Sequence, residues 1–254
     1  MTEWALETAG LTKRFSGLVA VDGVDLRIPK GEIRGVVGPN GAGKTTLFNL
    51  ISGLYVASSG AVKVSGRDIT TAPPHTRAAM GLGRTYQTPH IFPELSLFDN
   101  VAVGLAGART LREATFGRRG PREAVVAELQ EALDFMHLPT SLGALAGTLS
   151  FGAQKRLEIA RALVGRPSVL MLDEPAAGLN RSEIDELAVL VRAIRERGVT
   201  VVLIEHNMRV VMGLCDRITV LDFGKKIAEG TADEVRADPL VIAAYLGGVT
   251  HAPV

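Results

Sequence analysis

Cysteine is almost absent from this sequence: Cys215 is the single one among 254 residues. One thiol cannot close a disulfide within the chain, which excludes the class of small disulfide-stabilised extracellular domains. Residues 1–5 show neither the basic cluster nor the apolar stretch of a secretion signal. We therefore expect the protein to work in the reducing environment of the cytoplasm.

The sequence also lacks long apolar runs and an excess of charge. The apolar run at residues 101–108 is far shorter than the roughly 18 residues that a membrane span needs. Lys and Arg total 28 against 27 Asp and Glu, so nucleic acid is not expected as the main partner. What the chain has instead is 46% hydrophobic residues, enough for a sizeable core. Any membrane role has to come through a partner.

Hydrophobic periodicity separates strand-rich, helical and alternating parts of the chain. We expect strands at residues 4–11, 24–28, 33–37, 61–64, 83–86, 169–172, 200–204, 218–221 and 226–228. We expect helices at residues 43–52, 153–164 and 182–197, with helical spacing throughout 98–136. A solvated loop is predicted for the basic cluster of Arg109, Arg112, Arg118, Arg119 and Arg122. Continuous apolar strands alternating with helices after Ser150 indicate a parallel sheet covered on both faces.

A glycine-rich turn between an apolar strand and a helix fits the phosphate-binding loop pattern. Its residues are Gly38, Pro39, Asn40, Gly41, Ala42, Gly43, Lys44, Thr45 and Thr46. Glycines allow backbone N–H groups to turn toward phosphate oxygens, and the helix N-terminus adds the positive end of its dipole. Lys44 would supply charge to the outer phosphates and Thr45 a hydroxyl to Mg²⁺. This loop favours a nucleoside triphosphate over a dinucleotide.

Two later strands end in polar side chains that suit phosphate chemistry. Asp173 and Glu174 close the apolar run 169–172, and His206 follows the run 200–204. Asp173 would hold Mg²⁺, and Glu174 would act on the attacking water as a general base or orienting group. Parallel strands present their carboxyl ends at one edge of a sheet, so His206 is expected near the same phosphate.

Residues 149–153 form a second candidate anion site. Ser150 and Gly152 are small and stand at the start of a predicted helix, where backbone donors are exposed. This segment lies far in sequence from Lys44. Whether one chain can bring both to one nucleotide stays open at this point.

Taken together and in this order, residues 38–46, Gln87, 149–153, 169–174, 178–180 and His206 resemble the ATP-binding cassette (ABC) transporter ATPases over essentially the whole chain. The resemblance implies an α/β phosphate-loop NTPase fold. In it, residues 1–87 and 149–254 form a RecA-like core with an antiparallel β subdomain, and 88–148 form a helical subdomain. It also implies ATP and Mg²⁺ as ligands, with Phe15 stacked on adenine and Gln87 in contact with Mg²⁺ and water.

The same resemblance implies partners. A homodimer, or a heterodimer with a second ABC ATPase, would place Ser150 and Gly152 of one chain over the ATP held by Lys44 of the other. Closure of that dimer would drive transmembrane permease subunits docked on the helical subdomain, supplied by a solute-binding protein. The chain would then lie peripherally at the cytoplasmic face of the inner membrane.

Residues 173–180, 204–208 and 241–247 are most similar to the ATPases of branched-chain amino acid importers. The ATPases of urea and short-amide importers and of lipopolysaccharide exporters share much of this sequence, so these systems remain alternatives. The chain departs from the general pattern at Ala153, where glutamine is commonest, and at Asn180, where aspartate is usual.

Two other classes of protein are disfavoured by the sequence. A soluble ABC ATPase of DNA repair or translation would carry long heptad insertions or a second cassette, and the sequence shows neither. A kinase with a phosphate loop would need an acceptor site with a lid, and a GTPase would need the guanine-reading Asn-Lys-x-Asp pattern, which is missing.

Overall fold

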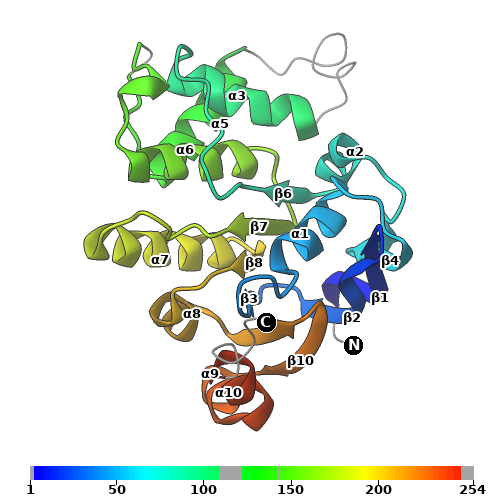
Figure 1. Ribbon diagram of the computed structural model, residues 1–254. Helices are drawn as coiled ribbons and strands as arrows, with labels where there is room; N and C mark the ends of the chain where they lie inside the picture. Colours follow the sequence, from blue (N-terminus) through cyan, green and yellow to red (C-terminus); the bar gives the residue numbers. More distant parts are fainter. Residues whose placement is uncertain (1–2, 109–121, 142, 247–254) are drawn as a thin grey trace.

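A computed structural model describes residues 3–108, 122–141 and 143–246 (Figure 1). Its strands form two sheets. The smaller has the order β2-β1-β4-β5 and the larger has the order β10-β9-β3-β8-β7-β6. The predicted α/β architecture, with an antiparallel sheet and a helical part beside a mainly parallel sheet, is confirmed.

The smaller sheet is antiparallel and contains β1 (Trp4–Phe15), β2 (Leu18–Pro29), β4 (Ser59–Val64) and β5 (Arg67–Asp68). A tight turn at Ser16 and Gly17, both with positive φ, joins the first two strands. These strands are longer than the predicted segments 4–11 and 24–28. The residues added to β1 are polar or exposed and carry no apolar alternation. Those added to β2 include the short apolar run 18–21, and its pairing with β1 identifies it as strand.

The larger sheet places the site. Its parallel strands are β3 (Ile33–Val37), β6 (Leu82–Arg84), β7 (Val169–Asp173), β8 (Thr200–Ile204) and β9 (Arg217–Asp222), with β10 (Lys225–Gly230) antiparallel at the edge. Every residue of β3, β7 and β8 is buried, as expected for strands covered on both faces. The carboxyl ends of β3, β7 and β8 therefore lie side by side at one edge.

Helices cover both faces of the larger sheet. They are α1 (Lys44–Ser52), α2 (Pro74–Ala79), α3 (Leu97–Ala108), α5 (Arg122–Phe135), α6 (Phe151–Leu163), α7 (Arg181–Glu196), α8 (Met208–Leu214), α9 (Ala232–Ala237) and α10 (Pro239–Leu246), with a 3-10 turn, η1 (Ala146–Thr148). The sequence patterns missed α2 and α8, which have 6 and 7 residues and are too short to show a period. Among the described residues, no helix is both long and apolar enough to cross a bilayer.

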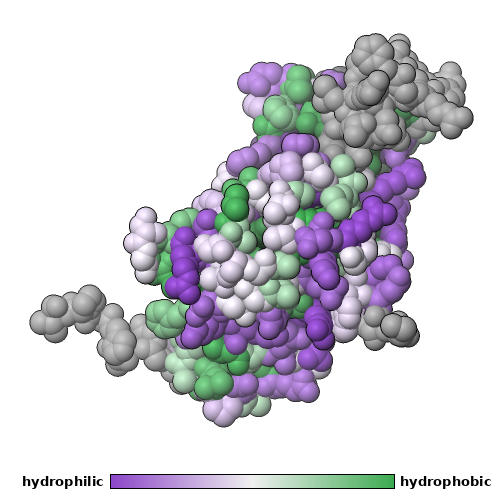
Figure 2. Space-filling view, turned by 90° about the vertical axis from the view of Figure 1, so that its right-hand side faces the viewer, coloured by the Kyte–Doolittle hydropathy of each residue, from purple (hydrophilic) through white to green (hydrophobic). Residues whose placement is uncertain are grey.

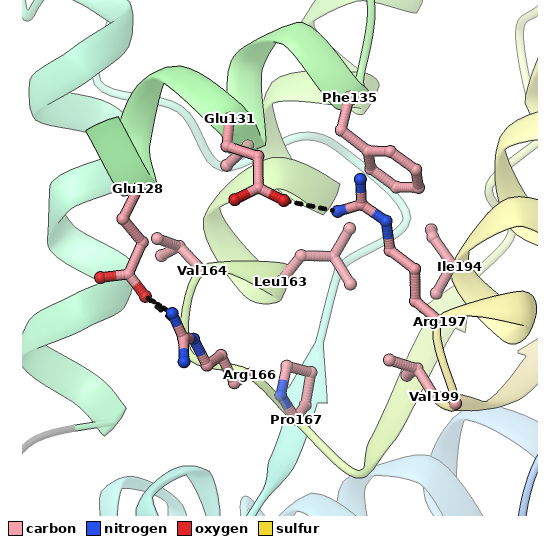
Figure 3. A pocket seen from close by; sticks show the side chains of 12 residues that line it. Glu128, Glu131, Phe135, Leu163, Val164, Arg166, Pro167, Ile194, Arg197 and Val199 are labelled. Carbon is pink, nitrogen blue, oxygen red and sulfur yellow. Dashed lines mark hydrogen bonds and ion pairs between the residues drawn. The ribbon is translucent and has the colours of Figure 1, made fainter. Parts of the chain in front are cut away.

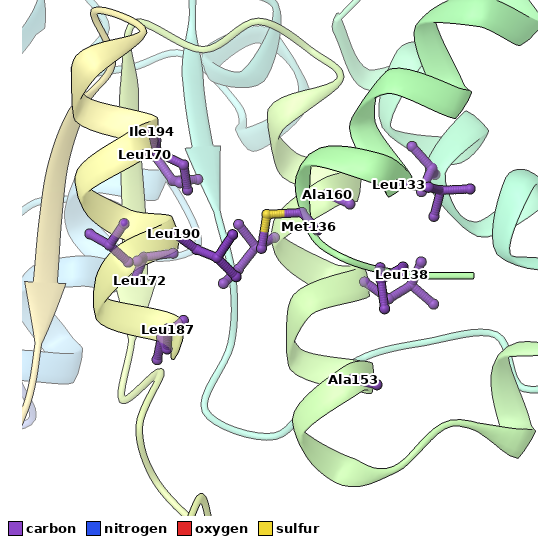
Figure 4. Close-up of a cluster of buried hydrophobic side chains, with 14 of the residues drawn as sticks. Leu133, Met136, Leu138, Ala153, Ala160, Leu170, Leu172, Leu187, Leu190 and Ile194 are labelled. Carbon is purple, nitrogen blue, oxygen red and sulfur yellow. The ribbon is translucent and has the colours of Figure 1, made fainter. Parts of the chain in front are cut away.

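The core has one main layer on each face of the larger sheet, and a smaller cluster packs β9 against α8, α9 and α10. Leu170 and Leu172 of β7 belong to the layer under α3, α5, α6 and α7, whereas Val169 and Met171 belong to the layer shared with α1 and the smaller sheet. Figure 4 shows Met136, just beyond α5, among the apolar side chains of α6 and α7. The helical part thus packs directly on the helices that carry the candidate site.

The predicted helical subdomain, residues 88–148, includes α3 and α5, which lie together above the larger sheet and away from the smaller one (Figure 1). The division of the chain into subdomains stays a prediction. Of the basic cluster, Arg109, Arg112, Arg118 and Arg119 lie outside the described residues. On the face shown in Figure 2, apolar side chains are mostly scattered among hydrophilic ones and gather toward the lower end, where α9 and α10 lie.

Candidate functional site

The phosphate-loop candidate joins the end of β3 to the start of α1. Gly38, Gly41 and Gly43 have φ values of 155°, 82° and 98°, which side chains other than glycine rarely allow. A Cβ on Gly38 would lie 2.1 Å from the backbone oxygen of Leu221, and one on Gly43 would lie 2.4 Å from that of Ala20. Glycine is therefore required at these two positions by the packing of the loop as well as by its shape.

Lys44 folds back over this loop. Its Nζ donates to the backbone oxygens of Gly38 at 2.7 Å and Pro39 at 2.9 Å. Burial lowers the pKa of Lys44, while the nearby carboxylates of Glu174 and Asp173 act in the opposite direction. A half-buried ammonium group thus stands between the loop and the carboxylates at the end of β7.

A hollow of about 370 Å³ opens over the loop. It is lined by Leu18, Val19, Ala20, residues 40–46, Glu174 and Phe223. The volume is within the range of small-molecule sites in proteins. Phe223 was not singled out from the sequence, because a lone aromatic residue after a strand carries no recognisable signal.

Several predicted site residues lie outside this lining, namely Gly38, Pro39, Gln87, Asp173 and His206 as well as Phe15, Ser150 and Gly152. Phe15 is 39% exposed and meets Tyr55 edge-on, with ring centroids 5.4 Å apart. Ser150 and Gly152 lie at the start of α6 and line no part of the hollow. A single chain therefore brings Glu174 to the phosphate loop, but it does not bring the second candidate anion site there.

Gln87, Glu174 and His206 meet although they follow three different strands. Gln87 Nε2 donates to Glu174 Oε2 at 2.7 Å, and His206 Nδ1 is 3.5 Å from the same oxygen. The structure thus brings together the three residues predicted to be catalytic. The parallel order of β6, β7 and β8 is what places them at one edge.

Asp173 is buried beside Arg84, a residue that the sequence reasoning missed. Arg84 Nη2 donates to Asp173 Oδ2 at 3.1 Å, and its Nη1 donates to Ser52 Oγ at 2.5 Å. Burial raises the pKa of Asp173, and the Arg84 guanidinium opposes that effect. An arginine at the end of a short strand was the available sign, but surface arginines are far too common for it to stand out.

The segment 149–153 has a local structure that its sequence predicts. The Ser150 hydroxyl caps α6 by accepting from the backbone N–H of Ala153 at 3.3 Å. A Cβ on Gly152 would come within 2.7 Å of Glu183 Oε1, so a larger residue would press on the start of α7. Asn180 caps α7 through a reciprocal pair of hydrogen bonds with Glu183.

Buried charges behind the site also escaped the sequence reasoning. Lys155 Nζ donates to the backbone oxygen of Glu174 at 2.8 Å. Glu205 accepts from the backbone N–H of Ala176 at 2.7 Å and also from those of His206 and Asn207. Burial raises the pKa of Glu205 and lowers that of Lys155. Both side chains hold the backbone of loops that carry candidate catalytic residues.

A second hollow, of about 380 Å³, lies between α5 and the ends of α6 and α7 (Figure 3). Its rim carries two ion pairs, Arg166 with Glu128 at 3.0 Å and Arg197 with Glu131 at 3.3 Å. None of the predicted site residues lines it. The hollow over the phosphate loop is therefore the candidate active site, although it is slightly smaller.

Comparison with known proteins agrees with this geometry. Residues 21–177 match the sequence model of the ABC transporter family, and residues 225–251 match that of the branched-chain amino acid ATP-binding cassette transporters. The chain is 42% identical to the high-affinity branched-chain amino acid transport ATP-binding protein BraF of Pseudomonas aeruginosa, covering 97% of this chain and 99% of BraF. It is 40% identical to the corresponding protein LivG of Escherichia coli, with the same coverage.

Solved structures give the same result. The ADP conformation of an ATP-binding cassette of an ABC transporter superimposes with a TM-score of 0.84 at 32% identity, over 97% of this chain and all of that one. A nucleotide-free cassette gives a TM-score of 0.83, also at 32% identity, over 96% of this chain and 99% of that one. The predicted kinship is confirmed: this chain belongs to the ABC transporter family, forms an ATP-binding cassette and is an ATPase.

Proposed function

We propose that this chain is the ATP-hydrolysing subunit of an importer for branched-chain amino acids or similar small polar solutes. Two relatives at 42% and 40% identity carry high-affinity branched-chain amino acid transport in their names. The match at residues 225–251 points to the same group. The position of the Glu174 carboxylate supports the proposal of ATP hydrolysis: Gln87 holds it by a 2.7 Å hydrogen bond, and Glu174 lines the hollow over the phosphate loop.

In this proposal, Glu174 acts as the general base or orients the attacking water. Gln87 and His206 fix its carboxylate through the same oxygen, Oε2. Lys44 and the backbone N–H groups of the loop balance the charge on the phosphates. Such an arrangement suits phosphoryl transfer, because that reaction depends mainly on positioning and charge neutralisation.

The residues present suit Mg²⁺ as the second ligand. Thr45, Gln87 and Asp173 offer a hydroxyl, an amide and a carboxylate oxygen, the hard donors that this ion prefers. In the part of the chain that the structure describes, no three His, Cys, Asp or Glu side chains gather into a metal cluster. A single carboxylate is sufficient for Mg²⁺, since the phosphates of ATP and water supply its other ligands. When bound, Mg²⁺ would neutralise charge on the β- and γ-phosphates.

The second half of each nucleotide site would come from another cassette. Ser150 is exposed at the start of α6 and does not line the hollow of its own chain. We therefore infer that Ser150 and Gly152 cover ATP held by the Lys44 loop of a second copy or of a second ABC ATPase. Another ATP-binding cassette, 24% identical and of the same fold, is dimeric with ADP and phosphate bound. Phe15, partly exposed on the smaller sheet, would stack on the adenine.

Membrane permease subunits would dock on the helical part, residues 88–148, and a solute-binding protein would deliver the cargo to them. The chain itself would lie peripherally at the cytoplasmic face of the inner membrane.

An importer of urea or short amides is one alternative. A lipopolysaccharide exporter is a second one, because an ATP-binding protein of such a system from Acidithiobacillus ferridurans is 38% identical over 95% of this chain and 96% of that one.

Reconstitution tests this proposal. The chain would be assembled in proteoliposomes with the permease subunits encoded beside it. With ATP present, the uptake of labelled leucine, the uptake of labelled urea and the movement of lipopolysaccharide would each be measured. We expect ATP-dependent leucine uptake, and we expect Glu174→Gln to slow turnover about 10²- to 10⁴-fold while the protein still binds ATP. ATP hydrolysis that moves urea or lipopolysaccharide but no leucine would contradict the cargo assignment. Near-normal turnover of Glu174→Gln would remove the role of Glu174.

A further inference from the structure

Lys155 is a buried cation aimed at the backbone of the proposed catalytic residue. It lies on α6, its residue is 4% exposed, and its Nζ donates to the backbone oxygen of Glu174 at 2.8 Å. The same oxygen accepts from the N–H of Ala177 at 3.1 Å, and the N–H of Glu174 donates to Ile204 at 3.0 Å. Neighbouring elements therefore hold the peptide groups on both sides of Glu174.

Glu174 needs this support because of its own conformation. Its φ is 47°, in the left-handed region that residues other than glycine disfavour. A residue in this region keeps its conformation only when its surroundings fix it. The direction of the side chain depends on that backbone conformation, so whatever holds the Glu174 carbonyl also helps to aim its carboxylate.

The helix that carries Lys155 also holds the loop of Gln87. Glu158, nearly one turn further along α6, accepts from the backbone N–H groups of Tyr86 and His90 at 3.3 Å each. These two groups stand on either side of Gln87. A single helix thus anchors both segments whose side chains meet at 2.7 Å in the site.

We propose that Lys155 is a positioning residue that makes the placement of the Glu174 carboxylate depend on the position of α6. The inference rests on the proposed function, because it assigns the hydrolytic role to Glu174. α6 begins next to Ser150, the residue expected to face the nucleotide of the partner cassette. Lys155 lies five residues beyond Ser150, about 7.5 Å along the helix axis, so a shift of the helix start moves the ammonium group with it.

The consequence is a link between the two nucleotide sites that runs within one chain. ATP bound by the partner cassette contacts the start of α6 and shifts it, and Lys155 passes this shift to the Glu174 peptide group of its own site. A purely structural Lys155 would instead satisfy the carbonyl of a buried turn and affect stability alone. The two roles differ in what they do to turnover at constant ATP affinity.

The test compares Lys155→Met, which keeps the length of the side chain but removes the donor, with Arg156→Met. Arg156 is the next residue of α6 and pairs with Glu186, away from both loops. We expect Lys155→Met to lower kcat about tenfold or more with the KM for ATP within about threefold of wild type. We expect Arg156→Met to keep kcat within about threefold. Lys155→Gln, whose amide is too short to reach the carbonyl, carries the same expectation as Lys155→Met and replaces it if that variant does not fold.

A double-mutant cycle with Glu174→Gln separates positioning from general weakening. If Lys155 acts through the Glu174 carboxylate, Lys155→Met should lower the residual turnover of Glu174→Gln by less than about twofold. Binding of a fluorescent ATP analogue should stay within about threefold of wild type in every Lys155 variant. If Lys155 only stabilised the fold, the kcat of the folded Lys155 variants would stay near that of wild type.

Two results would overturn the inference. One is a folded Lys155→Met or Lys155→Gln protein with kcat within threefold of wild type. The other is a full, additive loss in the Glu174→Gln background, which would mean that Lys155 acts independently of that carboxylate. Near-normal turnover of Glu174→Gln alone is a different failure, since it removes the proposed function of Glu174 and the role of Lys155 with it.

Discussion

Arg84 holds the carboxylate of Asp173 before any metal is involved. Its Nη2 donates to Asp173 Oδ2 at 3.1 Å, and each of the two side chains is 7% exposed. The second arm of the guanidinium donates to Ser52 Oγ on α1, the helix that begins with Lys44. One arginine on β6 therefore ties the end of β7 to the helix behind the phosphate loop.

Replacing Arg84 with Met should destabilise the nucleotide-free protein by about 3 kcal/mol, because it leaves Asp173 as a buried carboxylate without its cation. Thermal unfolding without ATP and Mg²⁺ measures the loss. Arg166→Met is the matched control, since Arg166 pairs with Glu128 but its side chain is 81% exposed. An exposed pair contributes little, so the control should change stability by less than about 1 kcal/mol. Equal losses of stability in the two variants would show that the buried pair of Arg84 and Asp173 contributes no more to the free energy of unfolding than the exposed pair.

Lys44→Ala should weaken ATP binding by about 1.5–3 kcal/mol, the usual contribution of a hydrogen bond to a charged group. Titration with a fluorescent ATP analogue measures the affinity. Lys30→Ala removes a lysine that pairs with Glu3 on the surface, and it should leave the affinity unchanged. If Lys44→Ala also bound ATP normally, residues 38–46 would not be the phosphate site.

Cys215 gives a prediction about pH. Burial raises the pKa of its thiol to about 12, whereas the same thiol in the unfolded chain ionises near 9. The unfolded state therefore loses this proton first as pH rises. The stabilisation is complete below pH 9 and is lost between about pH 9 and 12, at a rate of up to about 1.4 kcal/mol per pH unit. Urea unfolding at pH 8 and pH 10 should show a smaller loss of stability in Cys215→Ala than in wild type. Identical losses would mean that the thiol ionises alike in both states.

The sequence was most informative where local chemistry and position coincide. The glycines around Lys44 predicted a tight loop because few other residues adopt positive φ, and the apolar runs before Asp173 and His206 predicted adjacent buried strands. From these strands alone the meeting of Glu174 and His206 at one sheet edge could be expected. That edge is a property of parallel topology, which hydrophobic patterns reveal well.

The missing parts of the site depend on long-range packing. Arg84 and Lys155 look like ordinary surface cations in a linear sequence. Only the folded chain shows that both side chains are buried, Arg84 against the end of β7 and Lys155 against the residue that follows it. The helix α8 was missed although Asn207 caps it, because 7 residues give too little periodicity. Glu205 was passed over next to His206 for a similar reason, since nothing local distinguishes a structural carboxylate from a catalytic one.

In the proposed dimer, ATP lies between two cassettes, held by the Lys44 loop of one and covered by Ser150 and Gly152 of the other. Sedimentation velocity of Glu174→Gln with and without ATP measures this dimer, because slow hydrolysis preserves the closed state. We expect a dimer with ATP, a monomer without it, and a monomer with ATP in the double variant Glu174→Gln, Ser150→Arg, where bulk at the start of α6 blocks closure. A double variant that still dimerises with ATP, or a single variant that binds ATP and stays monomeric, would mean that ATP is not held between two cassettes in this way.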